Sequence, residues 1–331
     1  MTGVLPDTQR PLDEAEAERA FGDMLDGKPS DEEIAAFLLA LSRRGEQAGE
    51  IAGAARAMRA RLLPISAPPG AIDVCGTGGD GHHSLNVSTA VSLVVAACGV
   101  PVAKHGNRAA SSKAGAADTL ECLGLDMDAA GRTAERTLAE IGICFLFAKN
   151  HHPAMGRIQP IRQKLGCRTI FNLMGPLSNP ARVTRQLIGI ARPAYVPVYA
   201  DALSRLTTDR GFVVSGDEGL DELSLDAGNE LADISGSEVR LRRVDASDAG
   251  LRHAPVEAIH GGDAAHNAKA LRALLIGAPG PYRDAVLFNS AAALMVAGEV
   301  SDWTDGVEMA GEAIDSGRAN HLLARWIEAC E

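Results

Sequence analysis

The sequence is poor in aromatic residues and in positive charge. Aromatic residues make up 4% of the 331 residues, so alanine, leucine, valine and isoleucine must supply most of the core. That bias suits helices packed on a parallel sheet. The formal net charge of −11 argues against a protein that follows a nucleic-acid backbone, because such proteins need a basic surface. It does not exclude small anionic substrates, which need only a local cluster of cations.

Long apolar runs and paired cysteines are also missing. Met1 to Glu14 has no apolar run, so we expect no signal peptide. The longest apolar stretch, around Ala90 to Cys98, is too short to span a bilayer. The six cysteines form no CxxC pair and most lie in apolar runs, as is typical of buried, reduced thiols. We therefore expect a cytoplasmic protein with no membrane partner.

What is present is a helical start followed by alternating strands and helices. Ser30 and Glu33 have capping-box spacing ahead of a helix, and an alanine-rich helix follows at 47–61. A linker with three prolines comes next, at 63–70. Strands are expected at 72–75, 100–104, 143–147, 186–190 and 212–215. This alternation predicts a parallel sheet covered on both faces.

Other segments depart from this rhythm. The stretch 153–177 is expected to form two short helices with no strand between them. The stretch 230–244 is expected to be an antiparallel or peripheral excursion. Further helices are expected at 267–275, at 284–297 and from 307 to the C-terminus.

A glycine-rich loop, Gly76 to Gly81, lies between the first strand and the next helix. Glycines let backbone N–H groups approach an anion, and Asn86, Ser88 and Thr89 crowd the helix start that favours phosphate. A plain tight turn is the simpler alternative. The glycines also fit GxGxxG, but a dinucleotide site needs an acidic residue after the next strand, where this chain has Lys104.

A second polar loop, Lys104-His105-Gly106-Asn107-Arg108, ends the second strand. Ligands of open α/β sheets bind at such carboxyl ends, and Lys104 could pair with pyrophosphate. Taken alone, this loop could be a solvated turn. Beside the glycine loop, a phosphate-binding function is favoured.

Carboxylates and arginines complete the candidate chemistry. Asp221 and Glu222 follow the strand at 212–215, and magnesium usually takes one or two carboxylates together with substrate phosphates. A solvated acidic turn is the alternative. Arg157, Arg162 and Arg168 could each grip a carboxylate with two parallel bonds, or simply lie on a solvated helix face.

Successive motifs resemble those of the anthranilate phosphoribosyltransferase family. The likeness covers about residues 45–298 and rests on these segments: Gly76-Thr77-Gly78-Gly79-Asp80, Asn86-Val87-Ser88-Thr89, Lys104 to Arg108 with Ser111-Ser112, Gly115-Ala116-Ala117-Asp118, His151 to Met155, Arg168 to Asn172, Gly175-Pro176-Leu177 and Asp221-Glu222. Departures from the family pattern stand at Ser84-Leu85, often threonine–phenylalanine, and at Ala116, often serine.

The resemblance implies an α/β fold class, with a small all-helical domain plus a larger α/β domain that has a mostly parallel central sheet. The helical dimerisation domain would be 1–68 plus about 153–183. The α/β domain, which binds phosphoribosyl pyrophosphate (PRPP), would be 69–152 plus about 184–331. The family usually assembles as a homodimer through the helical domain. No nucleic acid is expected as a partner.

The resemblance also assigns site residues. Anthranilate would contact Gly76, Asn107 and Arg162, and two Mg²⁺ ions would be held by Ser88, Asp221 and Glu222. The PRPP-binding site would be lined by residues of the two polar loops and of the helix starts that follow them: Gly76, Gly79, Asp80, Ser84, Asn86, Val87, Ser88, Thr89, Lys104, His105, Gly106, Asn107, Arg108, Ala109, Ala110, Ser111, Ser112 and Ala116.

The implied reaction moves the phosphoribosyl group of PRPP to the amine of anthranilate. It gives N-(5-phosphoribosyl)anthranilate and pyrophosphate, the second step of tryptophan synthesis from chorismate, and needs no covalent or obligate acid–base residue. Two alternatives share this fold. A pyrimidine nucleoside phosphorylase is disfavoured by Asn107-Arg108 and Asp221-Glu222, and a nucleic-acid-binding protein is disfavoured by the net charge of −11.

Overall fold

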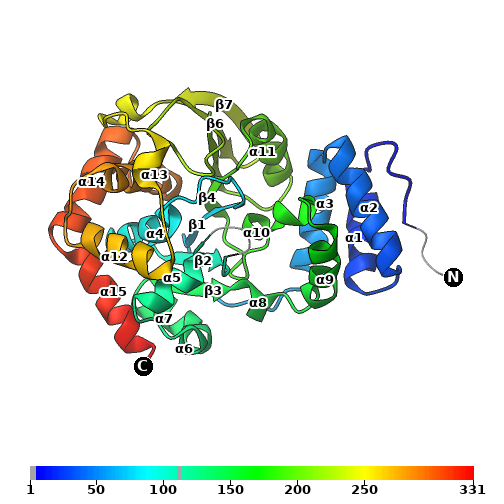
Figure 1. Cartoon of the computed structure of the whole chain (residues 1–331), viewed down its shortest axis with the longest axis horizontal. Coiled ribbons are helices and arrows are strands. Elements are labelled where there is room, and N and C mark those ends of the chain that lie inside the picture. The colour runs from blue at the N-terminus through cyan, green and yellow to red at the C-terminus, as the bar shows by residue number, and fades with distance from the viewer. Residues whose placement is uncertain (1–4, 110–112) are drawn as a thin grey trace.

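A seven-stranded sheet forms the centre of the larger part of the molecule (Figure 1). The computed structural model describes residues 5–109 and 113–331. The strand order is β3-β2-β1-β4-β5-β6-β7; β1 to β5 pair in parallel, whereas β6 and β7 are antiparallel. The strands are β1 Ile72–Gly76, β2 Val102–Gly106, β3 Ile143–Phe147, β4 Arg185–Gly189, β5 Arg210–Gly216, β6 Asn229–Ser235 and β7 Glu238–Val244. The mostly parallel sheet and the antiparallel excursion are therefore confirmed.

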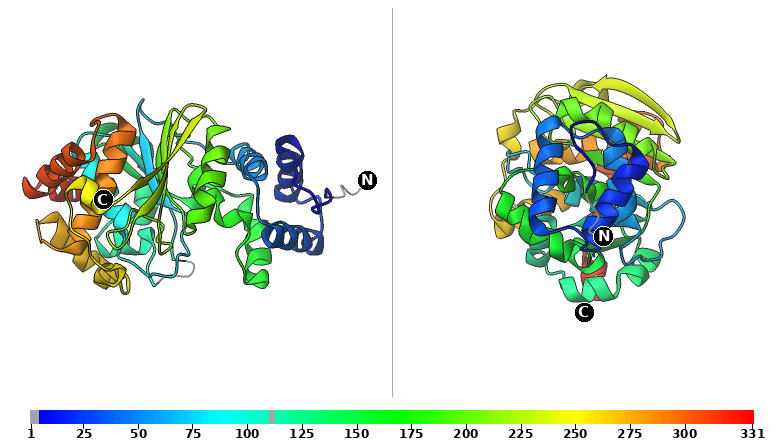
Figure 2. Two further views of the ribbon diagram at one scale, coloured as in Figure 1. Left: turned by 90° about the horizontal axis from the view of Figure 1, so that it is seen from above. Right: turned by 90° about the vertical axis from the view of Figure 1, so that its right-hand side faces the viewer.

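Helices cover both faces of this sheet (Figure 2). The helices are α1 Glu14–Leu25, α2 Asp31–Arg44, α3 Ala48–Arg59, α4 Val87–Ala97, α5 Ala116–Cys122, α6 Met127–Arg132, α7 Ala134–Glu140, α8 Ala148–His151, α9 Met155–Leu165, α10 Met174–Leu177, α11 Val196–Ser204, α12 Ala264–Leu275, α13 Pro281–Ala297, α14 Trp303–Asp315 and α15 Arg318–Ala329. Side chains alternate across a strand. Phe212 and Val214 of β5 thus join the core under α4 and α13, and Val213 joins the core under α11.

A smaller helical part stands at one end of the molecule (Figures 1 and 2). The Ser30–Glu33 capping box starts α2 as expected, and Asp13 with Glu16 caps α1 in the same way. Phe21 of α1 packs edge-on against Phe37 of α2. The helix α9 returns to this part of the molecule, since its apolar residues share a core with α1 and α2. The small helical part and the larger α/β part agree with the expected fold class.

Several element boundaries differ from the expected ones by a few residues, and two differences change the description of the molecule. The second strand runs from Val102 to Gly106 rather than from Val100 to Lys104, so His105 also lies inside β2. The helical pattern from Val307 to the C-terminus forms two helices, because α14 ends at Asp315 and Gly317 takes the left-handed conformation with φ of 77° before α15. A side chain rarely adopts such a φ, so a glycine suits this break.

The strand β7 forms one edge of the sheet, and most of its side chains are exposed. Its arginines pair with carboxylates: Arg240 with Glu238, Arg242 with Asp233, and Arg243 with Asp217 and Glu230. Among the described residues, no helix combines the length and the apolar character needed to cross a bilayer. All six cysteines are free thiols.

Candidate active site

The carboxyl end of β1 opens into the glycine loop that leads to α4. The strand order reverses beside β1, and such a switch point is the usual ligand crevice of an open α/β sheet. Gly78, Gly79 and Gly81 have φ of 70°, 73° and 85°, a backbone conformation that residues other than glycine rarely adopt. The loop therefore requires glycine at these three positions.

The acidic pair comes to this loop from the segment after β5. An Asp221 Oδ2 atom accepts the Gly78 N–H at 2.6 Å, and a Glu222 Oε1 atom accepts the Ser88 N–H at 3.1 Å. The acidic pair, more than 130 positions further along the chain, thus meets the glycine loop and the start of α4 at one place. This convergence is the geometry that the sequence motifs predicted.

Negative charge is concentrated at this meeting point. Burial raises the pKa of Asp221, and the neighbouring Asp80 raises it further. Burial also raises the pKa of Glu222, with Asp221 as the next cause. Crowded, buried carboxylates are costly without a cation, and hard carboxylate oxygens are the ligands that Mg²⁺ prefers. The donor set therefore fits a magnesium site completed by substrate phosphates.

Two further glycines make room for Asp221. A Cβ atom on Gly76 would overlap the Asp221 carboxylate, and a Cβ atom on Gly189, at the end of β4, would overlap the Asp221 backbone carbonyl. Gly189 was not predicted as part of the site. Its only signal in the sequence is a glycine at the end of a strand, where close backbone approach is a recognised reason for glycine.

Lys104 lies beneath the loop rather than on the surface. Its side chain is 2% exposed, and Nζ donates to the Val74 carbonyl at 2.7 Å and to Ser88 Oγ at 3.3 Å. Burial lowers the pKa of Lys104, whereas the buried Asp73 opposes that shift. Asp73, which no sequence motif singled out, also accepts the His105 N–H at 3.1 Å. The ammonium group is thus held between β1 and the start of α4.

The other residues predicted to bind PRPP belong to the same two loops and the helix starts that follow them. Some of their polar atoms already have partners within the protein. Arg108 is turned away, since it pairs with Asp118 and Glu121 of α5. The Asn86 Oδ1 atom accepts from Thr119 and Asn267. The following flank the loops: Ser84, Val87, Gly106, Asn107, Ala109 and Ala116. Ala110, Ser111 and Ser112 lie outside the described residues.

One hydroxyl near the loop has no partner. Thr89, in the first turn of α4, is 2% exposed, and its Oγ1 atom makes no hydrogen bond within the described structure. Buried hydroxyls are normally paired, so this orphaned atom is consistent with a polar ligand at the start of α4.

The three candidate arginines have different surroundings. Arg157 donates to the carbonyls of Gly27 and Pro29 in the helical part. Arg168 donates to the carbonyls of Gly78 and Gly79. Within the described structure, the guanidinium of Arg162 makes one hydrogen bond, a 3.4 Å contact with Gln159, and burial lowers its pKa. Arg162 is therefore the arginine most available to a carboxylate ligand.

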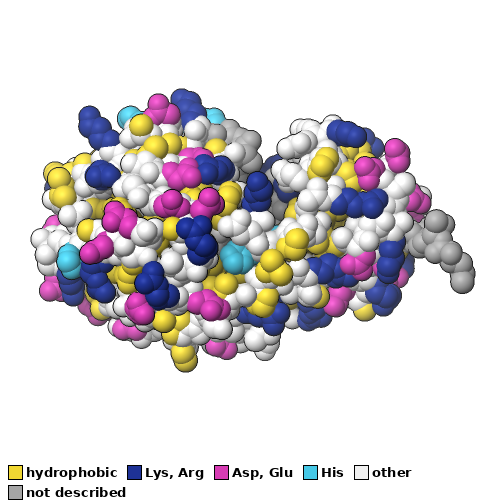
Figure 3. Space-filling model, turned by 90° about the horizontal axis from the view of Figure 1, so that it is seen from below, with side chains coloured by type: hydrophobic (Ala, Val, Ile, Leu, Met, Phe, Trp, Pro, Cys, Tyr) yellow, Lys and Arg dark blue, Asp and Glu magenta, His cyan; other side chains and the backbone are white. Residues whose placement is uncertain are grey.

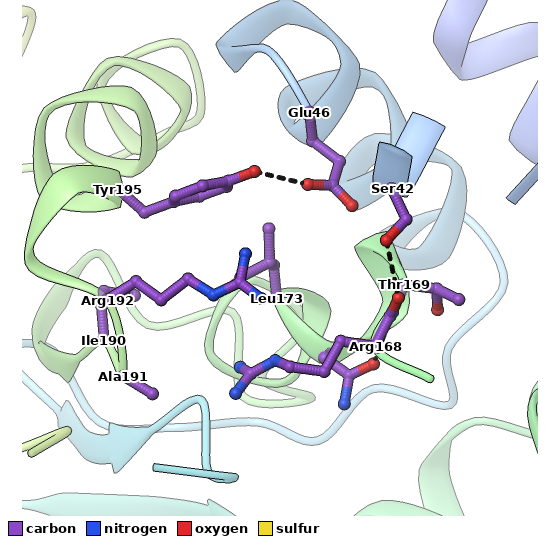
Figure 4. Close-up of a pocket in the computed structure, with 10 residues that line it drawn as sticks. Ser42, Glu46, Arg168, Thr169, Leu173, Ile190, Ala191, Arg192 and Tyr195 are labelled. Carbon is purple, nitrogen blue, oxygen red and sulfur yellow. Dashed lines mark hydrogen bonds between the residues drawn. The ribbon is translucent and has the colours of Figure 1, made fainter. Parts of the chain in front are cut away.

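A small pocket lies where the helical part meets the end of β4 (Figure 4). Charged and polar side chains dominate its lining, which consists of Ser42, Glu46, Arg168, Thr169, Asn172, Leu173, Ile190, Ala191, Arg192 and Tyr195. The Tyr195 hydroxyl donates to Glu46 at 2.8 Å and so ties η2 (Pro193–Tyr195) to the helical part. The pocket was not anticipated from the sequence, because its walls come from segments far apart in the chain.

Comparison with known families defines the class of protein. Residues 6–62 match the helical bundle domain of the glycosyl transferase family, and residues 68–320 match the α/β domain of the same family. These two matches cover the helical part and the sheet part described above. The chain is therefore an enzyme of the glycosyltransferase class.

The relatives are more specific. An anthranilate phosphoribosyltransferase of Erythrobacter litoralis is 74% identical, with 96% of each chain covered. The crystal structure of the Thermus thermophilus anthranilate phosphoribosyltransferase is 42% identical, covers 97% of this chain and 96% of that one, and has a TM-score of 0.92. The Saccharomyces cerevisiae enzyme in complex with PRPP and Mg is 28% identical, with coverage of 96% and 93% and a TM-score of 0.87. The chain belongs to the anthranilate phosphoribosyltransferase family.

Proposed function

We propose that this chain transfers the phosphoribosyl group of PRPP to the amine of anthranilate, releasing pyrophosphate. The observation that carries the proposal is the meeting of the glycine loop with Asp221 and Glu222 through the Gly78 and Ser88 amides. A glycine loop of this kind can bind an anion through the amides that these carboxylates leave unused, and paired carboxylates hold the cation that accompanies a polyphosphate. Family membership supports the same reaction.

PRPP is proposed to lie along the two loops at the carboxyl ends of β1 and β2. The glycine-loop amides and Lys104 would contact the pyrophosphate, and the residues from Asn86 to Thr89 would contact the phosphate end. Asp221, Glu222 and the Ser88 hydroxyl would hold two Mg²⁺ ions, which when bound neutralise charge on the pyrophosphate. A family relative in complex with PRPP and Mg supports the choice of ion.

Anthranilate is proposed to bind at Asn107 and Arg162 on the side of the helical part, against Gly76. The Arg162 guanidinium would grip the carboxylate and leave the neutral amine facing the anomeric carbon. An arylamine is a fair nucleophile when neutral, so orientation supplies more of the rate than a strong base would. Lys104 stabilises the negative charge that develops on the leaving group, and the ribose carbon acquires oxocarbenium character.

The loss of anthranilate fluorescence tests the reaction directly. Enzyme, PRPP and Mg²⁺ together should consume the fluorescence of anthranilate, and omission of PRPP or addition of a chelator should abolish the change. Phosphate-dependent cleavage of thymidine or uridine, without loss of anthranilate, would instead identify a nucleoside phosphorylase. Tight DNA binding at moderate salt would favour a nucleic-acid-binding protein; the face shown in Figure 3 interleaves acidic and basic side chains and gives that alternative no support.

The assembly and domain division are part of the same proposal. We assign 1–68 plus about 153–183 to a helical dimerisation domain and the remainder to the PRPP-binding domain. The packing of α9 with α1 and α2 supports this discontinuous division. Sedimentation velocity should give a homodimer of 34.5 kDa chains. The free cysteines support a cytoplasmic location.

A further inference from the structure

Arg168 makes an unusual contact with the glycine loop. Its Nη1 atom donates to the Gly79 carbonyl at 2.8 Å, and its Nη2 atom donates to the Gly78 carbonyl at 3.3 Å. One guanidinium therefore holds two successive peptide groups in the part of the loop where φ is positive. The positive φ values turn the two carbonyls toward the same donor. The loop therefore needs glycine at these positions in order to make this contact with Arg168.

This contact fixes the direction of two N–H groups. A trans peptide is planar, and its N–H points opposite to its C=O. None of the described peptide bonds is cis. The peptides whose carbonyls face Arg168 must therefore aim the N–H groups of Gly79 and Asp80 away from it. Within residues 5–109 and 113–331, neither N–H group donates to a protein acceptor.

Arg168 is itself anchored to the helical part of the molecule. The Ser42 hydroxyl of α2 donates to the Arg168 carbonyl at 2.9 Å, as Figure 4 shows. The side chain runs along the wall of the pocket between the two parts, close to Arg192. Burial lowers the pKa of the Arg168 guanidinium, and Arg192 lowers it further. The arginine therefore connects α2 to a loop of the sheet.

We propose that Arg168 is a positioning residue that aims the Gly79 and Asp80 amides at the pyrophosphate of PRPP. The inference rests on the proposed function and extends it to a residue that acts through the backbone of the glycine loop. Two preorganised N–H donors need no reorientation when the leaving group gains charge, which is how such donors lower a barrier. The contact from Ser42 makes the aim of these amides depend on the position of the helical part.

Steady-state kinetics of Arg168→Ala and Arg168→Lys test the proposal. Arg168→Ala should raise the KM for PRPP and lower kcat, together reducing kcat/KM for PRPP by about tenfold or more, as expected for the loss of charged hydrogen bonds. The KM for anthranilate should stay within about twofold. Arg168→Lys keeps the charge but can hold one carbonyl, so its kcat/KM for PRPP should be intermediate.

Arg157→Ala is the matched control. Arg157 also donates to two backbone carbonyls, those of Gly27 and Pro29, but far from the glycine loop. It should lose similar thermal stability while its KM for PRPP stays unchanged. Titration calorimetry with PRPP and Mg²⁺, in the absence of anthranilate, should show weaker binding for Arg168→Ala alone.

Three outcomes would overturn the inference. An unchanged KM and affinity for PRPP in Arg168→Ala would remove the positioning role. A raised KM for anthranilate alone would make Arg168 a ligand of that substrate's carboxylate. Equal losses in Arg157→Ala would mean that only stability matters. A wild-type enzyme that consumes no anthranilate with PRPP would instead refute the proposed function, so the two failures are distinguishable.

Discussion

His105 of β2 and His152 form a buried pair beside the loop that is proposed to bind PRPP. Their ring centroids are 5.2 Å apart, and their Nε2 atoms are 3.3 Å apart. His105 Nδ1 also lies 2.9 Å from the Gly175 carbonyl, so it is the donor of that contact. Burial lowers the pKa of His105 to about 3 and that of His152 to about 4. Both rings are therefore neutral in the folded protein at neutral pH.

This pair should make the folded protein sensitive to mild acid. Histidine in an unfolded chain has a pKa near 6.5. Below that pH the two rings are protonated in the unfolded state but stay neutral in the folded state. The stabilisation from the neutral pair is fully present above about pH 6.5. It is lost as pH falls toward the folded-state pKa values, about 4 for His152 and about 3 for His105. We expect a loss of about 2 kcal/mol per histidine between pH 6.5 and pH 5. Urea unfolding at a series of pH values measures it.

The slope with pH, rather than stability at one pH, isolates this effect. His152→Asn should flatten the slope between pH 6.5 and pH 5, whatever stability it loses at pH 7. His321→Asn is the control, because His321 is exposed on α15. Identical slopes for the wild type and His152→Asn would show that the pair does not govern the acid response.

The arginine on α9 gives a second prediction at the scale of a residue. Arg162→Ala should raise the KM for anthranilate by about tenfold to a hundredfold, because a bidentate charged contact is lost. PRPP binding, measured by calorimetry, should survive. Lys164→Ala removes an exposed cation from the same helix and should change neither constant. Equal loss of both substrates in Arg162→Ala would count against the assignment of Arg162.

At the scale of the elements, the end of β4 sets the position of the acidic segment. Gly189 pairs with Gly76 in the β1–β4 register, and the Asp221 backbone passes directly over it. The two strands thus form a floor without side chains, on which the metal-binding carboxylates are expected to rest. A side chain added at Gly189 must displace the backbone of Asp221, whereas one added at Gly76 would meet the Asp221 carboxylate.

Gly189→Ala should therefore weaken the use of magnesium. Displacement of Asp221 by even about 1 Å is expected to raise the Mg²⁺ concentration for half-maximal activity by about tenfold or more. Gly156→Ala is the control, since that glycine lies in α9 with open space around it. It should leave activity unchanged and stabilise the fold by up to about 1 kcal/mol. An unaltered Mg²⁺ dependence in Gly189→Ala would show that Asp221 is placed independently of β4.

The helices and strands could largely be predicted from the sequence, whereas the contacts between them could not. Local signals such as the Ser30–Glu33 capping box and the apolar run at Ile143 act within a few residues, so they located α2 and β3. The roles of Gly189 and Asp73 depend on strands that meet only after folding. The side-chain partners of Arg108 likewise come from the next helix, so a loop motif alone could not reveal that its guanidinium turns away.

At the scale of the whole molecule, the helical part and the sheet share a continuous core. Apolar residues of α1 to α3 belong to one buried cluster with those of α11, β4 and β5. A shared core couples the two parts, so they should unfold together. Both tryptophans, Trp303 and Trp326, lie in helices of the larger part and report its unfolding separately.

A core substitution in the helical part tests this coupling. Phe21→Leu leaves a small cavity beside Phe37 and Phe171 and should cost on the order of 1 kcal/mol. The midpoints from tryptophan fluorescence and from far-ultraviolet circular dichroism should fall by the same amount. A fall in the circular dichroism midpoint with an unchanged fluorescence midpoint would mean that the two parts unfold independently.

The charged outer strand β7 has a consequence for the behaviour of concentrated solutions. A free sheet edge is a template on which another chain can add a strand, and charged side chains are a common defence against that addition. Arg240, Arg242 and Arg243, with their carboxylate partners, place charge along this edge of the sheet. The protein should therefore not form fibrils by edge-to-edge pairing of its sheets, even at high concentration. Replacing those three arginines with neutral residues should allow such pairing.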